Sequence, residues 1–181
     1  MATHFRLLAA ILTASALLWA GAAWAQWPFS QPIARLEHSY GGVCEACDLS
    51  GRILTGARMT NSVFTGSNFS RAVLARADAS GSIFDEADFS DADLSETKLR
   101  EARCQDAVFE NAVLTNADAT SANFTGAAFQ GADVTGVNFA GANLSGANMR
   151  RARGLTQDQL RFACGDRNTR LPRGLSIARC G

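Results

Sequence analysis

The fold of this chain is decided by a repeating stretch, of which ADFSDADLSE at positions 87–96 is typical. Counting in fives from Leu49 to Met149 gives twenty-one positions, and each carries Leu, Phe, Met, Val, Ala or Cys. Two residues before each of these lies a second column, in which fourteen residues are Ala and three are Ser. Because a period of five matches neither a helix nor a strand, the chain must turn at regular intervals. Glycines at the outward corners, such as Gly51 and Gly126, suit a backbone that needs permissive dihedral angles.

A longer period of twenty appears when the apolar column is sorted by residue type. Residues of one kind then follow one another, as in the core ladders Phe69, Phe89, Phe109, Phe129 and Leu54, Leu74, Leu94, Leu114. We therefore expect residues twenty apart to lie directly above one another, so that four pentapeptides make one coil. About five coils would stack at the ~4.8 Å separation of neighbouring strands.

This pattern is similar to that of the pentapeptide-repeat family, A-(D/N)-L-x-x. The resemblance covers residues 47–151 and is carried by segments such as Ala87-Asp88-Phe89 and Ala142-Asn143-Leu144. It implies an all-β solenoid, a right-handed four-sided (quadrilateral) β-helix, with a handedness that spacing alone does not give. Three residues depart from the small column, and local bulging is expected there: Arg52, Thr97 and Val137.

The N-terminal segment predicts export. Arg6, an apolar run over 7–20 and the small residues before Gln26 are typical of a secretory signal peptide over 1–25, cleaved after Ala25. An uncleaved membrane anchor is the alternative, but the run is shorter than the ~20 residues of a membrane span. The mature chain is therefore expected in the periplasm, without membrane contact after cleavage.

Both ends of the repeat are expected to carry a cap, because a stacked repeat leaves an unpaired backbone edge at each end. Residues 26–46 would form the N-terminal cap and residues 152–181 the C-terminal one. In the C-terminal cap, Thr156 and Gln159 predict a capping box. A helix from about Gln157 to Cys164 should follow.

The cysteines predict two disulfides in an exported protein. Cys164 and Cys180 would close a loop in the C-terminal cap, worth ~3 kcal/mol in the chain-entropy model. Cys44 and Cys47 would close the N-terminal cap, although such a pair also suits a redox-active dithiol or half of a metal site. Cys104 belongs to the apolar column and is expected to be buried and unpaired.

Acidic residues gather in the middle of the repeat and form a candidate interaction surface: Asp85, Glu86, Asp88, Asp91, Asp93 and Glu96. Paired carboxylates can bind Ca²⁺ or act in acid–base catalysis. However, Glu86, Asp91 and Glu96 occupy the same slot of successive pentapeptides, so they face different directions, and Lys98 and Arg100 lie among them. The pattern favours a solvated, partly salt-bridged belt over a catalytic or metal site.

Some members of the resembling family mimic duplex DNA and act on DNA gyrase. That role needs acidic residues every twenty positions, as a stripe along one face. The best series here reads Asp48, Asn68, Asp88, Val108, Ala128, so the stripe stops after the middle. The predicted export also separates the chain from a cytoplasmic enzyme.

Composition and motifs exclude several classes of function. The chain has 17 basic and 17 acidic residues, so no overall charge points to nucleic acid. No phosphate-binding glycine motif appears, and neither catalysis nor a cofactor is expected. We expect a non-enzymatic scaffold that binds a protein partner through the acidic surface or through the basic tail, Arg161, Arg167, Arg170, Arg173 and Arg179. Two alternatives stay open: a small redox or metal-handling protein using Cys44 and Cys47, and a gyrase-binding DNA mimic.

Overall fold

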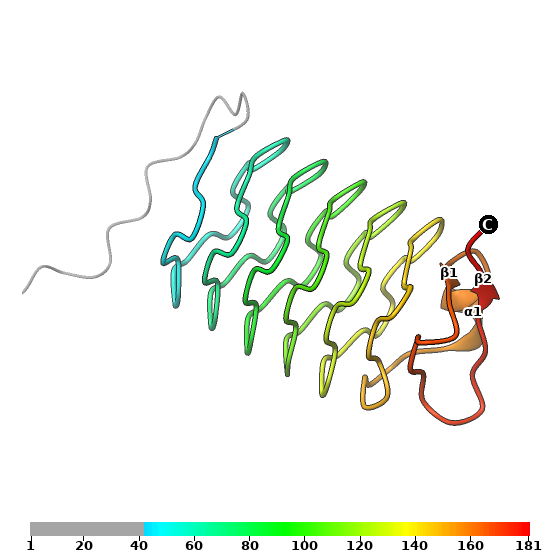
Figure 1. Ribbon diagram of the computed structural model, residues 1–181. Coiled ribbons are helices and arrows are strands. Elements are labelled where there is room, and N and C mark those ends of the chain that lie inside the picture. The colour runs from blue at the N-terminus through cyan, green and yellow to red at the C-terminus, as the bar shows by residue number, and fades with distance from the viewer. Residues whose placement is uncertain (1–41) are drawn as a thin grey trace, which may run out of the picture. The chain divides into compact units, whose positions relative to one another are not determined.

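The computed structural model describes residues 42–181, whose backbone winds as a stack of coils (Figure 1). The predicted signal peptide over 1–25 and most of the predicted N-terminal cap lie outside the described residues. None of the helices within 42–181 has the length and apolar composition of a membrane span.

Parallel bridges join residues twenty positions apart along this stack. They fall into four columns, which we name after Val63, Asn68, Val73 and Asp78. The bridged residues are, for the Val63 column, Val43, Val63, Ile83, Arg103, Asn123, Asn143 and Cys164; for the Asn68 column, Asp48, Asn68, Asp88, Val108, Ala128, Asn148 and Arg170; for the Val73 column, Ile53, Val73, Asp93, Val113, Asp133 and Arg153; and for the Asp78 column, Arg58, Asp78, Lys98, Asp118 and Asn138. The bridged pattern thus begins before 47 and continues past 151.

Each pentapeptide closes with a tight turn whose third residue has a positive φ. In the turn from Phe69 to Ala72, Ala72 N donates to Phe69 O at 2.9 Å and Arg71 has a φ of 59°. A positive φ at this place is typical of a type II turn. The same conformation occurs at every fifth residue from Ala46 to Gly146, and we name these residues the corner positions.

Asp and Asn in the bridge columns support the turns that follow them. Asn68 Oδ1 accepts a hydrogen bond from Ser70 N at 2.9 Å, and Asp133 Oδ1 accepts one from Thr135 N at 3.0 Å. Such Asx turns satisfy a backbone donor that the turn would otherwise leave to water. The second residue of the repeat therefore has a structural task in addition to its polarity.

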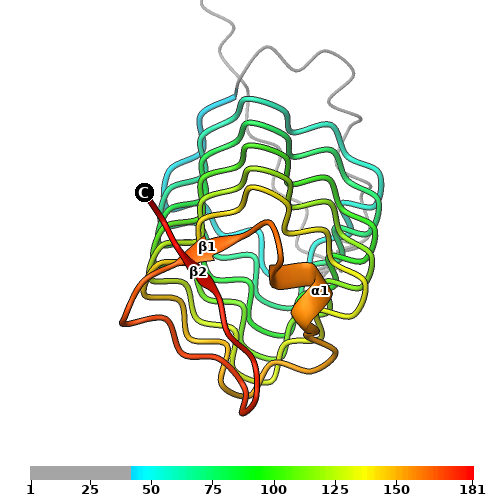
Figure 2. The same ribbon diagram turned by 90° about the vertical axis from the view of Figure 1, so that its right-hand side faces the viewer.

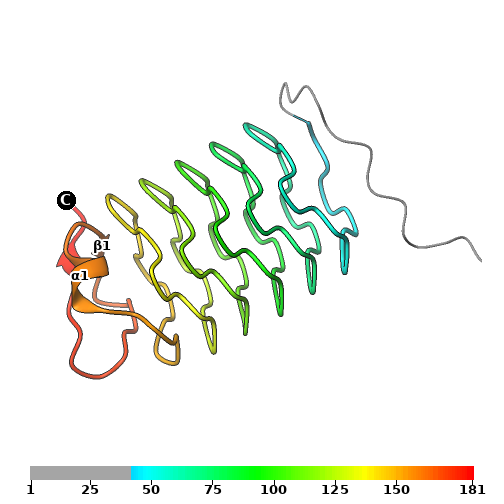
Figure 3. The same cartoon turned by 180° about the vertical axis from the view of Figure 1, so that it is seen from behind.

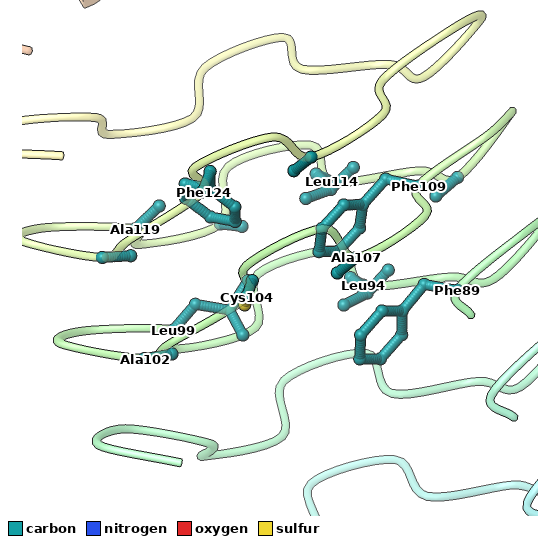
Figure 4. Packing of buried hydrophobic residues seen from close by; sticks show 14 of the residues in the cluster. Phe89, Leu94, Leu99, Ala102, Cys104, Ala107, Phe109, Leu114, Ala119 and Phe124 are labelled. Carbon is teal, nitrogen blue, oxygen red and sulfur yellow. The ribbon is translucent and has the colours of Figure 1, made fainter. Parts of the chain in front are cut away.

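Aromatic and aliphatic side chains fill the inside of the coils. The rings of Phe89 and Phe109 stack with centroids 5.0 Å apart, and both side chains are fully buried. Figure 4 shows Phe109 above Phe89 and Leu114 above Leu94 in successive coils. Like residues therefore do pack on like residues along the stack.

Thr97 and Val137 fit the small column without the expected bulge. Both are buried, and Thr97 Oγ1 donates to Leu74 O at 2.8 Å, which satisfies the buried hydroxyl. The neighbouring residues Lys98 and Asn138 keep their bridges in the Asp78 column. The expectation of local bulging was therefore wrong at these two positions.

The C-terminal segment covers the end of the last coil (Figure 2). It contains α1 (Gln157–Leu160), β1 (Cys164–Gly165) and β2 (Ala178–Arg179). β1 pairs in parallel with β2, and Cys164 also bridges to Asn143, so the cap extends the Val63 column. Figure 3 shows the same end from behind, with α1 and β1 beyond the last coil.

The predicted capping box of α1 is confirmed, but the predicted length is wrong. Thr156 accepts from Gln159 N, and the Gln159 side chain accepts from Thr156 N. The helix ends at Leu160 instead of Cys164. Cys164 is held in extended backbone, where its N donates to Ala142 O at 3.0 Å and its O accepts from Leu144 N at 2.7 Å.

Candidate interaction surfaces

Three members of the acidic surface, Glu86, Asp91 and Glu96, lie at corner positions. Each has a φ of 57° or 58° and an exposed side chain. Their carboxylates therefore point outward from three different corners, as the spacing predicts for a belt.

Two further members, Asp88 and Asp93, are engaged in their own turns. Asp88 Oδ1 accepts from Ser90 N at 2.8 Å, and Asp93 Oδ1 accepts from Ser95 N at 2.9 Å. The hydroxyls of the same serines donate to these oxygens as well. One oxygen of each carboxylate thus serves the fold.

Ion pairs engage two members of the acidic surface, Asp85 and the corner residue Glu96. Asp85 accepts from Arg103 Nη2 at 2.7 Å and from Gln105 N at 3.1 Å, and its side chain is only 13% exposed. Glu96 pairs with Arg76 at 3.3 Å in an exposed geometry, which stabilises by at most ~1 kcal/mol. Of the six acidic residues, all of them in the described part of the chain, only Glu86 and Asp91 make neither an ion pair nor a side-chain hydrogen bond.

A disulfide spans the first described turn. The sulfur atoms of Cys44 and Cys47 are 2.06 Å apart. Ser67 reaches the same turn from the next coil, where its Oγ accepts from Cys47 N at 3.1 Å and donates to Cys44 O at 2.6 Å. Both cysteines are partly exposed.

The other three cysteines lie in the cap and the core. Cys164 and Cys180 are joined at 2.01 Å, which links β1 to the residue after β2. Cys104 is free and fully buried. Burial raises the pKa of the Cys104 thiol, and the nearby carboxylate of Asp85 raises it further, so this thiol stays protonated. Within residues 42–181 no group of three or more His, Cys, Asp or Glu could hold a metal ion.

The five arginines of the predicted basic tail are all exposed. Arg161 follows α1 and pairs with Asp158 at 2.7 Å. Arg170 is the last bridged residue of the Asn68 column, and Arg179 belongs to β2. Arg153, which the sequence interpretation left out, ends the Val73 column. Arg153 lies twenty residues after Asp133 and therefore falls in the same column of the repeat. This spacing could have identified it from the sequence.

Asp166 anchors this basic segment to the last coil. Its Oδ1 accepts from Gly146 N at 2.8 Å, Asn168 N at 3.0 Å and Thr169 N at 3.0 Å. The hydrogen bond from Gly146 N is the largest of the effects that lower the pKa of Asp166. The residue stays ionised under all but strongly acidic conditions.

Comparison with known proteins agrees with this architecture. The family model described as pentapeptide repeats matches in eight copies, over residues 44–78, 67–103, 102–140 and 120–153. Among solved structures, the chain is similar to a pentapeptide repeat protein (Rfr23) from the cyanobacterium Cyanothece 51142. The two share 26% identity over 71% of this chain and 90% of that chain, with a TM-score of 0.54. No curated protein matches the chain.

Two further structures match with lower TM-scores, so they add no argument about this chain. A pentapeptide repeat protein from the thylakoid lumen of Arabidopsis thaliana shares 27% identity, over 64% of this chain and 79% of that one, with a TM-score of 0.35. QnrB1, a plasmid-mediated fluoroquinolone resistance protein, shares 22% identity over 76% of this chain and 92% of that chain, with a TM-score of 0.20. Because the matched repeats extend from 44 to 153, more than half of its length, this chain belongs to the pentapeptide-repeat family.

Proposed function

We propose that the protein is a non-enzymatic, exported scaffold that binds a protein partner in the periplasm or cell envelope. Its framework in this proposal is a right-handed, four-sided β-helix of about five coils. The observation that carries the proposal is the closed core, in which the side chains of the apolar column, at every fifth residue from Leu54 to Met149, are at most 7% exposed. Recognition by this stretch must therefore use the outer surface.

The cysteines support export. Cys44–Cys47 and Cys164–Cys180 are disulfides, and only the buried Cys104 is a free thiol among the described residues. Structural disulfides persist in oxidising compartments such as the periplasm. Each one also closes a part of the chain near an end of the described coil stack.

Glu86 and Asp91 are the members of the acidic surface that we assign to the partner. The other four carboxylates are engaged in turns or ion pairs, whereas these two project from neighbouring corners and have no side-chain partner among residues 42–181. A protein surface that presents lysine or arginine at matching positions would complement them.

Affinity capture from the envelope fraction tests this surface. The double variant Glu86→Gln/Asp91→Asn removes two negative charges, and Asn tolerates a positive φ. Its matched control, Glu45→Lys, produces the same change of charge at an exposed residue of the first coil. A protein captured by the wild type and the control, but not by the double variant, supports the proposal. Equal capture by all three, or a cytoplasmic location of the chain, contradicts it.

A redox or metal-handling role for Cys44 and Cys47 is the second candidate, because both are partly exposed. Thiol titration of the native protein with mass mapping separates the two functions. Two intact disulfides and one buried thiol support the scaffold. A readily reduced Cys44–Cys47 pair, with a thiol-exchange activity that Cys44→Ser abolishes, supports the redox role.

Gyrase binding by DNA mimicry needs a continuous acidic stripe along one face of the stack. Val108 and Ala128 interrupt the Asn68 column, so this stripe is broken.

A further inference from the structure

The C-terminal end of the coil stack is rich in arginine. Residues 150–181 contain eight arginines, two aspartates and no lysine or glutamate. We name these residues the arginine set, and all are exposed: Arg150, Arg151, Arg153, Arg161, Arg167, Arg170, Arg173 and Arg179.

The arginine set is distributed around the end instead of lying on one flank. Arg153 ends the Val73 column and Arg170 ends the Asn68 column. Arg179 lies in β2, which adds the outermost strand to the Val63 column. Arg161 follows α1, which Figure 2 shows on a different side of the end from β1 and β2. An end that carries arginines on several of its sides suits an extended flat surface better than a small ligand.

The two aspartates of this end leave most of that charge uncompensated. Asp158 pairs with Arg161, and within residues 42–181 no other member of the arginine set forms an ion pair. Asp166 is turned toward backbone donors of the last coil, among them Gly146 N. Seven guanidinium groups form no ion pair within the described residues and are therefore available to an external anion, although Arg153 also interacts with the carboxylate of Asp133.

An exposed aromatic residue stands at the same end. Phe162 is 71% exposed, although its backbone is fixed by a hydrogen bond from Gly141 N to Phe162 O at 2.7 Å. It directly follows Arg161. A large apolar side chain beside cationic ones is typical of protein surfaces that enter the headgroup region of a bilayer.

The middle of the stack has the opposite charge. Residues 83–102 contain seven acidic and two basic residues. A negatively charged surface would repel this coil and attract the C-terminal end. The charge distribution thus favours an approach by the end and disfavours contact along the side.

We propose that the arginine-rich C-terminal end docks on an anionic phospholipid surface. The guanidinium groups bind headgroup phosphates, for which their forked donors are suited, and Phe162 enters the boundary with the acyl chains. The spread of arginines over several sides of the end favours a bilayer over an acidic protein, which would need a patch on one flank. This proposal departs from the expectation that the mature chain has no membrane contact, and it is independent of the protein partner proposed above.

Co-sedimentation of the full-length chain with vesicles tests the proposal. Phosphatidylcholine vesicles with and without phosphatidylglycerol are compared at low and high salt. We expect binding that depends on phosphatidylglycerol and weakens with salt. Arg151→Gln/Arg170→Gln should lower the partition coefficient roughly 30-fold, since each basic residue near such a surface contributes ~1 kcal/mol. Phe162→Ser should lower it further by severalfold.

The matched control is Arg58→Gln/Arg71→Gln, which removes the same charge from exposed residues of the N-terminal coils. All variants share the apolar run at 7–20, so its affinity for lipid cancels in the comparison. Unchanged melting temperatures establish that the variants are folded. Equal losses in both double variants overturn the proposal, as does a loss in Arg151→Gln/Arg170→Gln that is the same with and without phosphatidylglycerol. Binding to polyglutamate but not to vesicles also overturns it and assigns the end to an acidic protein.

Discussion

At the residue scale, the corner positions show how one backbone conformation accommodates very different side chains. Nine corners are glycine and twelve are not, yet all have a φ between 52° and 74°. For residues such as Arg71 and Glu101 this conformation is intrinsically unfavourable by ~1–2 kcal/mol. The sequence shows that they share the glycine slot, but not that they share its φ, because the hydrogen bonds to both neighbouring coils impose the conformation.

Two glycine substitutions separate backbone strain from steric clash. Gly66 and Gly154 both have a positive φ, but a Cβ at Gly66 would meet nothing within 4 Å, whereas one at Gly154 would lie 2.8 Å from Thr135 Cα. Gly66→Ala should destabilise by ~1 kcal/mol, from strain alone. Gly154→Ala should cost ~1–3 kcal/mol more, because the backbone of Thr135 must move. Urea unfolding measures the free energy of unfolding of both variants. Equal losses would show that the structure relieves the contact with Thr135 without a loss of stability.

Asp133 provides a test of the Asx turn by pH. Hydrogen bonds from the Thr135 side chain and backbone, with the charge of Arg153, hold the pKa of Asp133 below its ordinary 3.8. The ionised carboxylate therefore stabilises the fold above that value, and its contribution is lost as pH falls through the lowered pKa. At neutral pH, Asp133→Ala should lower the free energy of unfolding by ~1 kcal/mol, and Asp133→Asn by less because the acceptor remains.

The measurement is the melting temperature of the three proteins between neutral pH and strong acid. The difference in melting temperature between wild type and Asp133→Ala should become smaller at strongly acidic pH. A gap that stays constant across this range would mean that the carboxylate charge contributes nothing to the turn.

At the scale of elements, the C-terminal cap shows where a sequence pattern stops being sufficient. The start of α1 is local, since the capping box needs only Thr156 and Gln159, and it could be predicted. Its end is set by distant groups, because Ala142 O and Leu144 N require Cys164 in extended backbone. The core ladders depend only on the period of the sequence and could be predicted. The role of each carboxylate in the acidic surface could not. Whether Asp88 serves its turn or a partner depends on hydrogen bonds that a single sequence does not show.

Gln159 has a second role that the capping box does not reveal. Its Nε2 donates to Val134 O at 2.8 Å and to Val137 O at 3.0 Å, where α1 replaces the next pentapeptide. Gln159→Glu keeps the cap acceptor but removes this donor and places a charge beside two carbonyls. It should destabilise the cap by ~1–3 kcal/mol.

Hydrogen exchange of the amides in residues 156–170 gives the free energy of opening of the cap and so measures this destabilisation. The matched control is Gln157→Glu, whose amide donates to Ser176 O at an exposed site, so a loss below ~1 kcal/mol is expected. Equal protection in Gln159→Glu and wild type would mean that the two carbonyls are satisfied by water.

At the scale of the whole described stack, each coil packs only on its two neighbours, so stability should behave as a sum of coils and interfaces. Volumes are balanced between neighbours and not within a coil. Cys104 and Ala119 occupy the ladders of Phe124 and Phe139 one coil below them, where the two rings are 6.1 Å apart in an edge-on contact. The residue types of one ladder predict stacking. That small side chains in one coil leave room for large ones in the next coil is seen only in the packing of the structure.

The middle and the end of the stack should therefore respond differently to the loss of a core side chain. Phe109 stacks on Phe89 at 5.0 Å and on Phe129 at 4.9 Å, so Phe109→Ala weakens two interfaces and should cost ~3–5 kcal/mol. Leu54→Ala lies in the first complete coil and should cost ~2–3 kcal/mol, mainly by fraying of that coil. In urea, with hydrogen exchange followed coil by coil, Phe109→Ala should broaden the transition because the two halves unfold separately. Leu54→Ala should leave the main transition sharp. If Phe109→Ala instead unfolds in one transition as steep as that of the wild type, the coils are coupled over longer range than contacts between neighbours provide.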